Sequence, residues 1–315
     1  LRHGCILTSL ILSARENMNN QSTSHLFMIE PESFFGNEQT ASSNHYQINE
    51  INEDPEAVAN KALNEFNSLK NVIEKRGIKV TALKGDKDCP DHIFPNWFIT
   101  FENKTMQIFS MMAPNRRLEK KPEMIEFLKE TYELTNDMSH LEEEGIFLES
   151  TSSMVFDRSN RCVYAGLSPR TNKDQLQIWC SQNNFELVMF ETESHSGSAI
   201  YHTDVLMYIG TDVIGICFEV IKPEYREMVR EKVQRFHDVL ELSNNQILNF
   251  CGNAIEAKNV EDELFLIIST SAFNALNQNQ INTLLKKYKE IIHSDIPTIE
   301  KYGGGSARCM LTELF

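Results

Sequence analysis

The chain has 315 residues, 41% of them hydrophobic, and a formal net charge of −15 at pH 7. This acidic balance argues against nucleic acids and anionic membranes as partners, because both attract basic surfaces. It does not exclude a small cationic substrate. The length allows one large domain or two ordinary ones.

Predicted elements begin at about residue 25. Residues 1–24 are expected to be an N-terminal extension, of which 1–17 are extraneous or disordered. A short apolar run, Ile6–Ala14, could be the end of a signal peptide but is too short to span a bilayer. Met18, which precedes a polar stretch, is the better candidate for a natural start. The folded domain is therefore expected to cover residues 25–315.

The first long element is a helix that runs from Asp54 to Gly77. Asp54 and Pro55 supply an N-cap and a first-turn proline, and a loop rich in Asn, Gln and Ser precedes them at 34–53. Apolar residues recur at helical spacing. These residues are Val58, Ala62, Phe66, Leu69 and Ile73.

The remaining elements repeat one order, strand–strand–helix–strand, about five times at a spacing of about 50 to 60 residues. Such repetition indicates a ring or array of similar units around a common axis. No Pro- or Ser-rich linker divides the chain, so we predict one closed α/β domain. Further helices are predicted to begin at Pro122, Asn172 and Pro223 and to cover about 279–292. The predicted strands are Leu26–Ile29, Ile78–Leu83, Phe98–Phe101, Met106–Met111, Ile146–Leu148, Ser153–Phe156, Val163–Leu167, Glu186–Phe190, Val205–Ile209, Val213–Val220, Ala254–Ala257, Leu264–Ser269 and Ile296–Ile299.

The cysteines indicate reduced thiols and therefore a cytoplasmic protein. Seven are scattered along the chain with no Cys-x-x-Cys pair, which fits neither a disulfide framework nor a zinc ribbon. The last of them, Cys309, follows three glycines, Gly303–Gly305, which permit positive φ and close approach to a ligand. This arrangement could present a nucleophile. The alternative is that Cys309 is one more buried small hydrophobe.

Four other clusters carry side chains suited to chemistry. Asp91 leads into an aromatic turn, Glu149 precedes small hydroxyl residues, and Arg170 lies in a turn that opens a helix. In the fourth cluster, His202 and Asp204 lie two residues apart and would share a face of an extended backbone. Each has a structural alternative: a turn cap for Asp91, a solvated strand end for Glu149 and a surface ion pair for Arg170.

A metal site is the alternative interpretation of His202-Thr203-Asp204. No second His-x-x-x-His or Cys/His pair completes a zinc shell, so we expect neither a metal ion nor another cofactor. His237, predicted in mid-helix, and His293, predicted at a helix end, have no convergent partner in the sequence and are expected to be structural.

Seven motifs occur in a fixed order along the chain: Asn37–Ala41, Pro90-Asp91 with Phe94–Trp97, Met111–Arg117, Leu148-Glu149, Leu167–Thr171, Tyr201–Thr203 and Gly303–Cys309. Together they resemble the guanidino-group-modifying enzymes of the pentein fold. The nearest likeness is to the arginine-deiminase-related branch that contains citrulline hydrolases. Dimethylarginine dimethylaminohydrolases and amidinotransferases are more distant relatives. The likeness runs from about residue 25 to the end and implies a five-bladed ring of ββαβ units, an α/β-propeller.

The resemblance also implies roles for single residues. Cys309 matches the family's nucleophile, His202 its general acid/base and Glu149 the carboxylate beside that histidine. Asp91 matches a carboxylate that helps to hold guanidino or ureido nitrogens. A cysteine near its ordinary pKa is mostly protonated at neutral pH, so a cationic substrate or a charged His202 would have to stabilise the thiolate.

Four further residues are candidates for substrate binding. Arg170 and Arg116 match positions where relatives bind the substrate's α-carboxylate, and the planar guanidinium suits both carboxylate oxygens. Asn96 is the single asparagine before Trp97, where the citrulline branch often has a second one, so the alignment of this loop shifts by one residue. Asp204 stands where that branch commonly has asparagine. A buried carboxylate pairs with a guanidinium but is left uncompensated by a ureido group.

These observations predict a cysteine-dependent hydrolase that cleaves a terminal C–N bond of an arginine- or citrulline-like amino acid. Asp204 favours arginine, overall similarity favours citrulline, and both stay open. The alternatives are an amidinotransferase, a non-catalytic binding protein on the same ring and a zinc enzyme. We expect a small amino-acid substrate as the partner and neither nucleic acid nor membrane, and a homodimer stays open.

Overall fold

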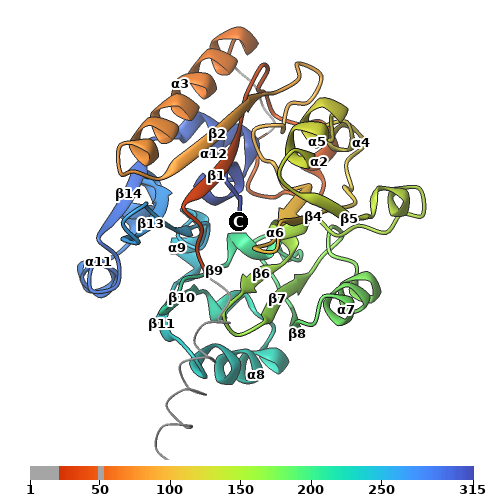
Figure 1. Cartoon of the computed structure of the whole chain (residues 1–315). Coiled ribbons are helices and arrows are strands. Elements are labelled where there is room, and N and C mark those ends of the chain that lie inside the picture. Colours follow the sequence, from red (N-terminus) through yellow and green to blue (C-terminus); the bar gives the residue numbers. More distant parts are fainter. Residues whose placement is uncertain (1–20, 49–52) are drawn as a thin grey trace, which may run out of the picture.

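Five three-stranded sheets are arranged around a common axis in the computed structural model, which describes residues 21–48 and 53–315 (Figure 1). In each sheet the middle strand pairs antiparallel with one neighbour and parallel with the other. The sheets are β15 (Thr312–Glu313), β1 (His25–Glu30) and β2 (Lys79–Lys84); β3 (Phe98–Thr100), β4 (Thr105–Ile108) and β5 (Glu133–Asp137); β6 (Val155–Asp157), β7 (Cys162–Leu167) and β8 (Glu186–Glu191); β9 (Met207–Ile209), β10 (Val213–Ile216) and β11 (Asp238–Glu241); and β12 (Ile255–Lys258), β13 (Leu264–Ser269) and β14 (Glu290–Ser294).

Each parallel pair is joined by a crossover that contains helix, as parallel strands require. These helices lie at the outside of the ring in Figure 1. They are α3 (Pro55–Glu74), α5 (Pro122–Lys129), α7 (Lys173–Gln182), α8 (Pro223–Gln234) and the consecutive α10 (Thr270–Ala275) and α11 (Gln278–Leu284). The fivefold repeat predicted from the sequence is thereby confirmed, as is the α/β class.

Helix α3 forms as its sequence predicts. The Asp54 side chain accepts a hydrogen bond from the Ala57 N–H at 3.0 Å, which satisfies one of the free donors of the first turn. The apolar residues predicted for its inner face, from Val58 to Ile73, are all buried. They pack in one core cluster with the first and last sheets.

The C-terminal strand closes the ring. β15 pairs with β1 through Phe27 opposite Thr312 and Leu26 opposite Glu313, and the C-terminus lies at the centre of Figure 1. The first sheet therefore combines both ends of the described chain.

The expected N-terminal extension, residues 1–24, lies outside the described residues as far as residue 20. Residues 21–24 are described, and they join the fold. Gln21, for example, is buried and donates hydrogen bonds to the carbonyls of Phe156 at 2.8 Å and Ile209 at 3.2 Å.

Several predicted elements are wrong in detail. The predicted strand Ile296–Ile299 is the start of a helix, because Pro297 takes the first helical position. The predicted helix at 279–292 ends at Leu284, and its last three residues lie in β14. Ile146–Leu148 forms only a single bridge, from Leu148 to Thr171. Within the loop predicted at 34–53 lies a short helix.

The remaining helices are short, and several of them carry or flank candidate site residues. These are α2 (Glu38–Ala41), α4 (Pro114–Arg117), α6 (Ser150–Ser153), α9 (Asn244–Leu248), α12 (Pro297–Gly303), and the 3₁₀ helices η1 (Ser139–Glu142), η2 (Thr203–Val205), η3 (Phe218–Val220) and η4 (Ala307–Met310). α6, η2 and η4 consist wholly of buried residues.

Candidate active site

Cys309 lies in η4, directly after the glycine turn that ends α12. The turn depends on Gly304, which has φ +60°, as the sequence analysis allowed. A Cβ there would lie 2.6 Å from the backbone nitrogen of Gln47, so a side chain would clash as well. The turn thus brings the backbone close to Cys309, whose side chain is buried.

The Cys309 sulfur contacts two polar side chains. It receives a hydrogen bond from Asn253 Nδ2 at 3.1 Å and donates one to Asp204 Oδ2 at 3.6 Å. Burial, and then the Asp204 carboxylate, raise the pKa of the thiol well above its ordinary value. The thiol is therefore protonated at neutral pH when the cavity is empty.

Asp204 is buried in η2, where its Oδ2 also accepts a hydrogen bond from Ser152 Oγ at 3.2 Å. Its Oδ1 has no hydrogen-bond partner among the residues that the structure describes. Burial raises the pKa of Asp204 to about 6.

His202 and Glu149 form a buried pair, with His202 Nε2 2.6 Å from Glu149 Oε2. Burial lowers the pKa of His202 to about 4, so the ring is neutral at pH 7. Burial also opposes ionisation of Glu149, but Arg170, His202 and Arg116 outweigh it and lower the pKa of the carboxyl. An ionised Glu149 accepts a hydrogen bond from Nε2–H, which leaves Nδ1 as the basic nitrogen. Nδ1 has no partner within the described part of the chain.

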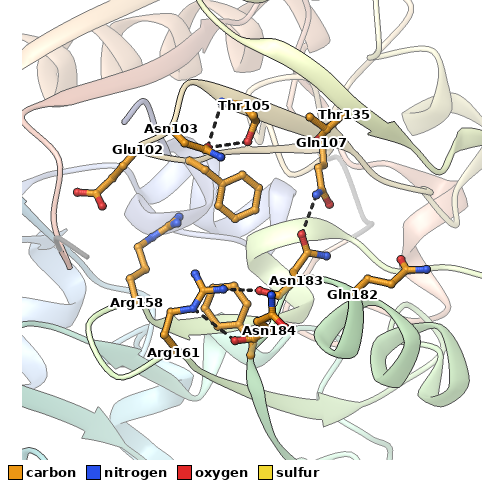
Figure 2. A pocket seen from close by; sticks show the side chains of 12 residues that line it. Glu102, Asn103, Thr105, Gln107, Thr135, Arg158, Arg161, Gln182, Asn183 and Asn184 are labelled. Atoms are coloured by element: carbon orange, nitrogen blue, oxygen red, sulfur yellow. Dashed lines mark hydrogen bonds between the residues drawn. The ribbon is translucent and has the colours of Figure 1, made fainter. Parts of the chain in front are cut away.

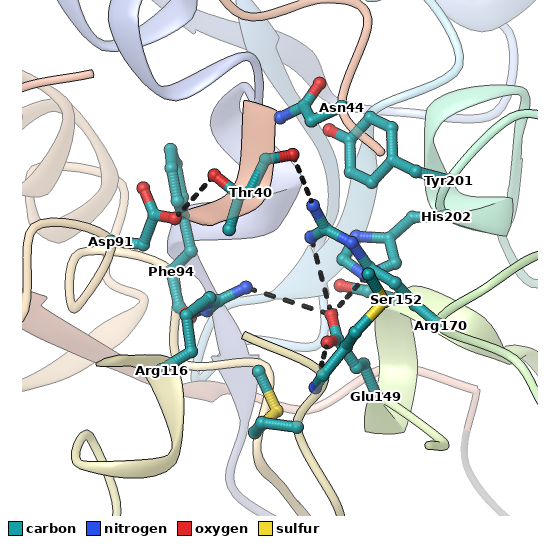
Figure 3. A network of polar contacts seen from close by, with 12 residues as sticks. Thr40, Asn44, Asp91, Phe94, Arg116, Glu149, Ser152, Arg170, Tyr201 and His202 are labelled. Carbon is teal, nitrogen blue, oxygen red and sulfur yellow. Dashed lines mark hydrogen bonds and ion pairs between the residues drawn. The ribbon is translucent and has the colours of Figure 1, made fainter. Parts of the chain in front are cut away.

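The two predicted carboxylate-binding arginines both approach Glu149 (Figure 3). Arg170 Nη1 lies 3.6 Å and Arg116 Nη1 3.9 Å from Glu149 Oε2. The other Arg170 nitrogens bind Ser43 Oγ at 2.7 and 3.1 Å and the Thr40 carbonyl at 3.3 Å. These contacts fix the Arg170 guanidinium beside the histidine pair.

Arg116 also makes three hydrogen bonds, two of them to one carboxylate. It donates to both oxygens of Glu119, at 2.9 and 3.1 Å, and to the Phe94 carbonyl at 2.6 Å. A guanidinium has five N–H donors, so these three bonds leave two for other partners, and the prediction that Arg116 binds a substrate carboxylate stays a prediction.

Asp91 faces the thiol's cavity from the side of α2 and is buried. Its Oδ2 accepts hydrogen bonds from Asn37 Nδ2 at 2.7 Å and Thr40 Oγ1 at 3.4 Å. Its Oδ1 has no partner in residues 21–48 and 53–315. Burial raises the pKa of Asp91.

One small cavity unites most of the predicted site residues. Cys309, His202, Asp91, Asn96, Arg116 and Arg170 line it, together with Asn44, Phe94, Tyr201, Gly303 and Gly305. Glu149 and Asp204 each stand behind a lining residue, His202 and Cys309 respectively. The cavity encloses only about 10 Å³, about the room of one water molecule. An amino-acid substrate would therefore require the lining to move apart.

Sequence reasoning missed three residues that hold the site together. Asn253 contacts the nucleophile candidate, Glu119 binds Arg116, and Ser43 binds Arg170. Asn253 and Ser43 are small polar residues in loops, a type too common to stand out. Glu119 could have been found, because it lies three residues after Arg116, a spacing at which opposite charges on a helical turn can pair.

A larger cavity, of about 500 Å³, lies between the second and third sheets and shares no lining residue with the Cys309 cavity (Figure 2). Its polar side chains bind one another, for example Gln107 Nε2 to Asn183 Oδ1 at 2.8 Å. Among the described residues that line it there is no histidine or cysteine.

In the part of the chain that the structure describes, residues 21–48 and 53–315, no group of three or more His, Cys, Asp or Glu side chains is placed to hold a metal ion. None of its helices is long and apolar enough to cross a bilayer.

The five ββαβ units, with a cysteine, a histidine and carboxylates gathered at the axis, define the class of pentein guanidino-modifying proteins. The sequence matches the family described as N,N dimethylarginine dimethylhydrolase, eukaryotic, over residues 30–315. The chain belongs to this family, one of those that the sequence analysis named as more distant. The resemblance of the seven motifs to guanidino-group-modifying enzymes of the pentein fold is confirmed. No curated protein sequence matches the chain.

Solved structures share the fold at low sequence identity. The N-terminal domain of ArgZ, an arginine dihydrolase from the ornithine–ammonia cycle in cyanobacteria, is 15% identical with a TM-score of 0.73, covering 92% of this chain and 97% of that domain. AgrE in complex with L-arginine is 13% identical with the same TM-score, over 92% of this chain and 40% of AgrE. A dimethylarginine dimethylaminohydrolase variant that carries an S-methyl-L-thiocitrulline adduct is 16% identical with a TM-score of 0.62, over 94% of this chain and 100% of that one.

Proposed function

We propose that the chain is a cysteine-dependent hydrolase of a guanidino amino acid, arginine or an N-methylated arginine, with Cys309 as the nucleophile. The observation that carries this proposal is a buried thiol with two carboxylates near it, Asp91 in the lining of the same cavity and Asp204 as the acceptor of the thiol's hydrogen. In each carboxylate Oδ1 has no hydrogen-bond partner among the described residues. Burying carboxylates without partners is costly, and a guanidinium would supply both charge and N–H donors. The neutral ureido group of citrulline would leave the charge uncompensated.

The acid–base state of the empty site supports activation by the substrate. Burial keeps the thiol protonated and His202 neutral. A bound guanidinium favours the thiolate by its charge, and the proton lost from sulfur passes to the free Nδ1 of His202. The thiolate then adds to the central guanidino carbon, and His202 returns the proton to the departing amine. A thiouronium adduct on Cys309 remains.

Water completes the reaction in the second half. His202 takes a proton from water as the resulting hydroxide adds to the same carbon. Collapse of this intermediate breaks the C–S bond, its hydroxyl proton restores the thiol and the ureido product leaves. The proton on His202 then passes to solvent. One C–N bond is exchanged for a C–O bond, and water supplies the oxygen and the protons. Glu149 keeps the ring oriented and stabilises its charged form.

Incubating the purified protein with each candidate substrate and identifying the products tests the proposal. We expect arginine or a methylated arginine to yield citrulline with release of ammonia or a methylamine, and citrulline itself to remain unchanged. Further release of ornithine and ammonia from citrulline would shift the assignment to citrulline hydrolysis. Ornithine formed only when an acceptor amine is added would indicate an amidinotransferase. No turnover of any of these compounds would overturn the proposal.

A further inference from the structure

Asn253 lies in the turn between α9 and β12, is fully buried, and belongs to none of the seven motifs. Its side chain connects the two segments that carry the nucleophile candidate and its acidic neighbour. Nδ2 donates hydrogen bonds to Cys309 Sγ at 3.1 Å and to the Asp204 carbonyl at 3.0 Å. Oδ1 accepts the Cys309 backbone N–H at 3.3 Å.

The partners fix the direction of this amide. The Asp204 carbonyl can only accept and the Cys309 backbone N–H can only donate, so Nδ2 must face the first and Oδ1 the second. The second hydrogen on Nδ2 is then directed to the sulfur. The thiol's own hydrogen goes to Asp204 Oδ2, at 3.6 Å. When the thiol loses its proton, the bond to Asp204 is lost and the bond from Asn253 is strengthened.

The neighbouring backbone is built for this contact. A Cβ on Gly252 would lie 2.3 Å from the Val205 carbonyl oxygen and 2.7 Å from the carbonyl carbon of Leu206. Only glycine allows the turn to press against η2 so closely. The preceding Phe250 has φ +61°, a left-handed conformation that is unfavourable for an aromatic residue. The turn that carries Asn253 is therefore held against the site at a cost in backbone energy.

We propose that Asn253 is a positioning residue of the active site: its amide holds Cys309 and Asp204 in register and donates the hydrogen bond that stabilises the Cys309 thiolate. This inference rests on the proposed function only in taking Cys309 as the nucleophile. It concerns a residue that touches the sulfur and not the substrate.

The direct readout is alkylation of Cys309 by iodoacetamide, followed by mass spectrometry of the C-terminal peptide between pH 6 and pH 10. The variants are Asn253→Ala, which removes the donor, and Asn253→Asp, which has the same shape but places a carboxylate beside the sulfur. The other charged and titratable groups around the sulfur, Asp204, Arg308, Tyr201 and His202, are unchanged in both. Because a hydrogen bond to a charged group stabilises it, we expect the loss of this bond in Asn253→Ala to slow alkylation of Cys309 about ten- to a hundredfold at a given pH. Asn253→Asp should be the slower of the two.

Gln246→Glu is the matched control. Gln246 is a buried amide in α9, seven residues before Asn253, and its Nε2 donates to the Ala275 carbonyl at 3.0 Å. The same amide-to-acid change there should disturb stability without slowing alkylation of Cys309. A merely structural role for Asn253 would loosen the site and speed alkylation, so the sign of the effect decides.

Equal or faster alkylation of Cys309 in folded Asn253→Ala would overturn the inference, even if Asn253→Asp fails to fold. The alkylation assay needs no substrate, so it stands apart from the proposed function. If no guanidino compound is turned over by the wild type, the proposed function fails and the alkylation result is unaffected. With a working substrate, we expect kcat of Asn253→Ala to fall while KM stays within about twofold.

Discussion

Two buried histidine–carboxylate pairs in this chain have almost the same geometry and very different surroundings. His202 Nε2 lies 2.6 Å from Glu149, and His237 Nε2 lies 2.7 Å from Asp157. In both pairs Nδ1 has no partner within the described residues. Distance and burial therefore do not distinguish a catalytic pair from a structural one.

The neighbours of the carboxylates do distinguish them. Glu149 has two arginines close by, and its histidine lines the cavity that holds Cys309. Asp157 instead accepts hydrogen bonds from Asn160, one from its backbone N–H at 3.0 Å and two from its side chain at 2.9 and 3.0 Å. His237 lines none of the cavities described above. The comparison indicates that fixed cations and an adjacent thiol, and not the pair itself, mark the site of chemistry.

The largest expected contrast is in activity. Replacing His202 with Gln should lower kcat by about 10²–10⁴, because the ring would serve as general acid and base. His237→Gln should leave kcat within about twofold of wild type, since neither His237 nor its partners Asp157 and Asn160 line the thiol's cavity. Steady-state kinetics of the two variants on the same substrate, with circular dichroism to verify folding, measure this. Equal losses of kcat would remove the distinction between the pairs.

The reverse contrast is expected in stability. Asp157→Ala leaves the buried His237 and the partly buried Asn160 without their acceptor, and an unsatisfied buried donor costs about 1–3 kcal/mol. We expect chemical denaturation to show this loss while kcat of the folded protein is retained. A variant of unchanged stability but low kcat would show that the His237 pair is linked to catalysis after all.

A smaller effect concerns pH. Burial lowers the pKa of His202 to about 4, against 6.5 in the unfolded chain, so the unfolded state binds more protons between these values. The stability that depends on neutral His202 is present above pH 6.5 and is lost as pH falls towards 4. We expect the free energy of unfolding of wild type to fall relative to that of His202→Gln by on the order of 1–3 kcal/mol over this range. Parallel curves for the two proteins would contradict it.

Much of the fold could be predicted from the sequence because local signals agreed with the tertiary structure. Asp54, Pro55 and the apolar face of α3 are examples. β14 could not be recognised, because Ile291 and Ile292 fit a buried helix as well as a buried strand until the pairing with β13 is known. The same limit affected His237 and His293. His237 follows α8 and is not in mid-helix, and His293 lies in β14 and not at a helix end.

The candidate site could be predicted as a set of residues but not as a network. Ordered motifs pointed to Cys309, His202, Glu149 and Asp91, which the structure brings to one cavity or directly behind it. Their hydrogen-bond partners, such as Asn253 for Cys309, lie far away in the sequence and come close only in the folded ring. The sequence also does not show which protein side chains bind a predicted substrate-binding residue. Arg116 was predicted to bind a substrate carboxylate, and its bidentate contact with Glu119 required the structure.

The central claim is that the substrate becomes attached to Cys309, and trapping that adduct tests it most directly. Wild type and His202→Gln would be quenched with acid during incubation with arginine or a methylated arginine, and the C-terminal peptide weighed by mass spectrometry. We predict a thiouronium adduct on Cys309 in the wild type that persists longer in His202→Gln, because the second half of the reaction needs the same imidazole. Turnover of the substrate by a Cys309→Ser variant, or an adduct formed only on another cysteine, would contradict the account.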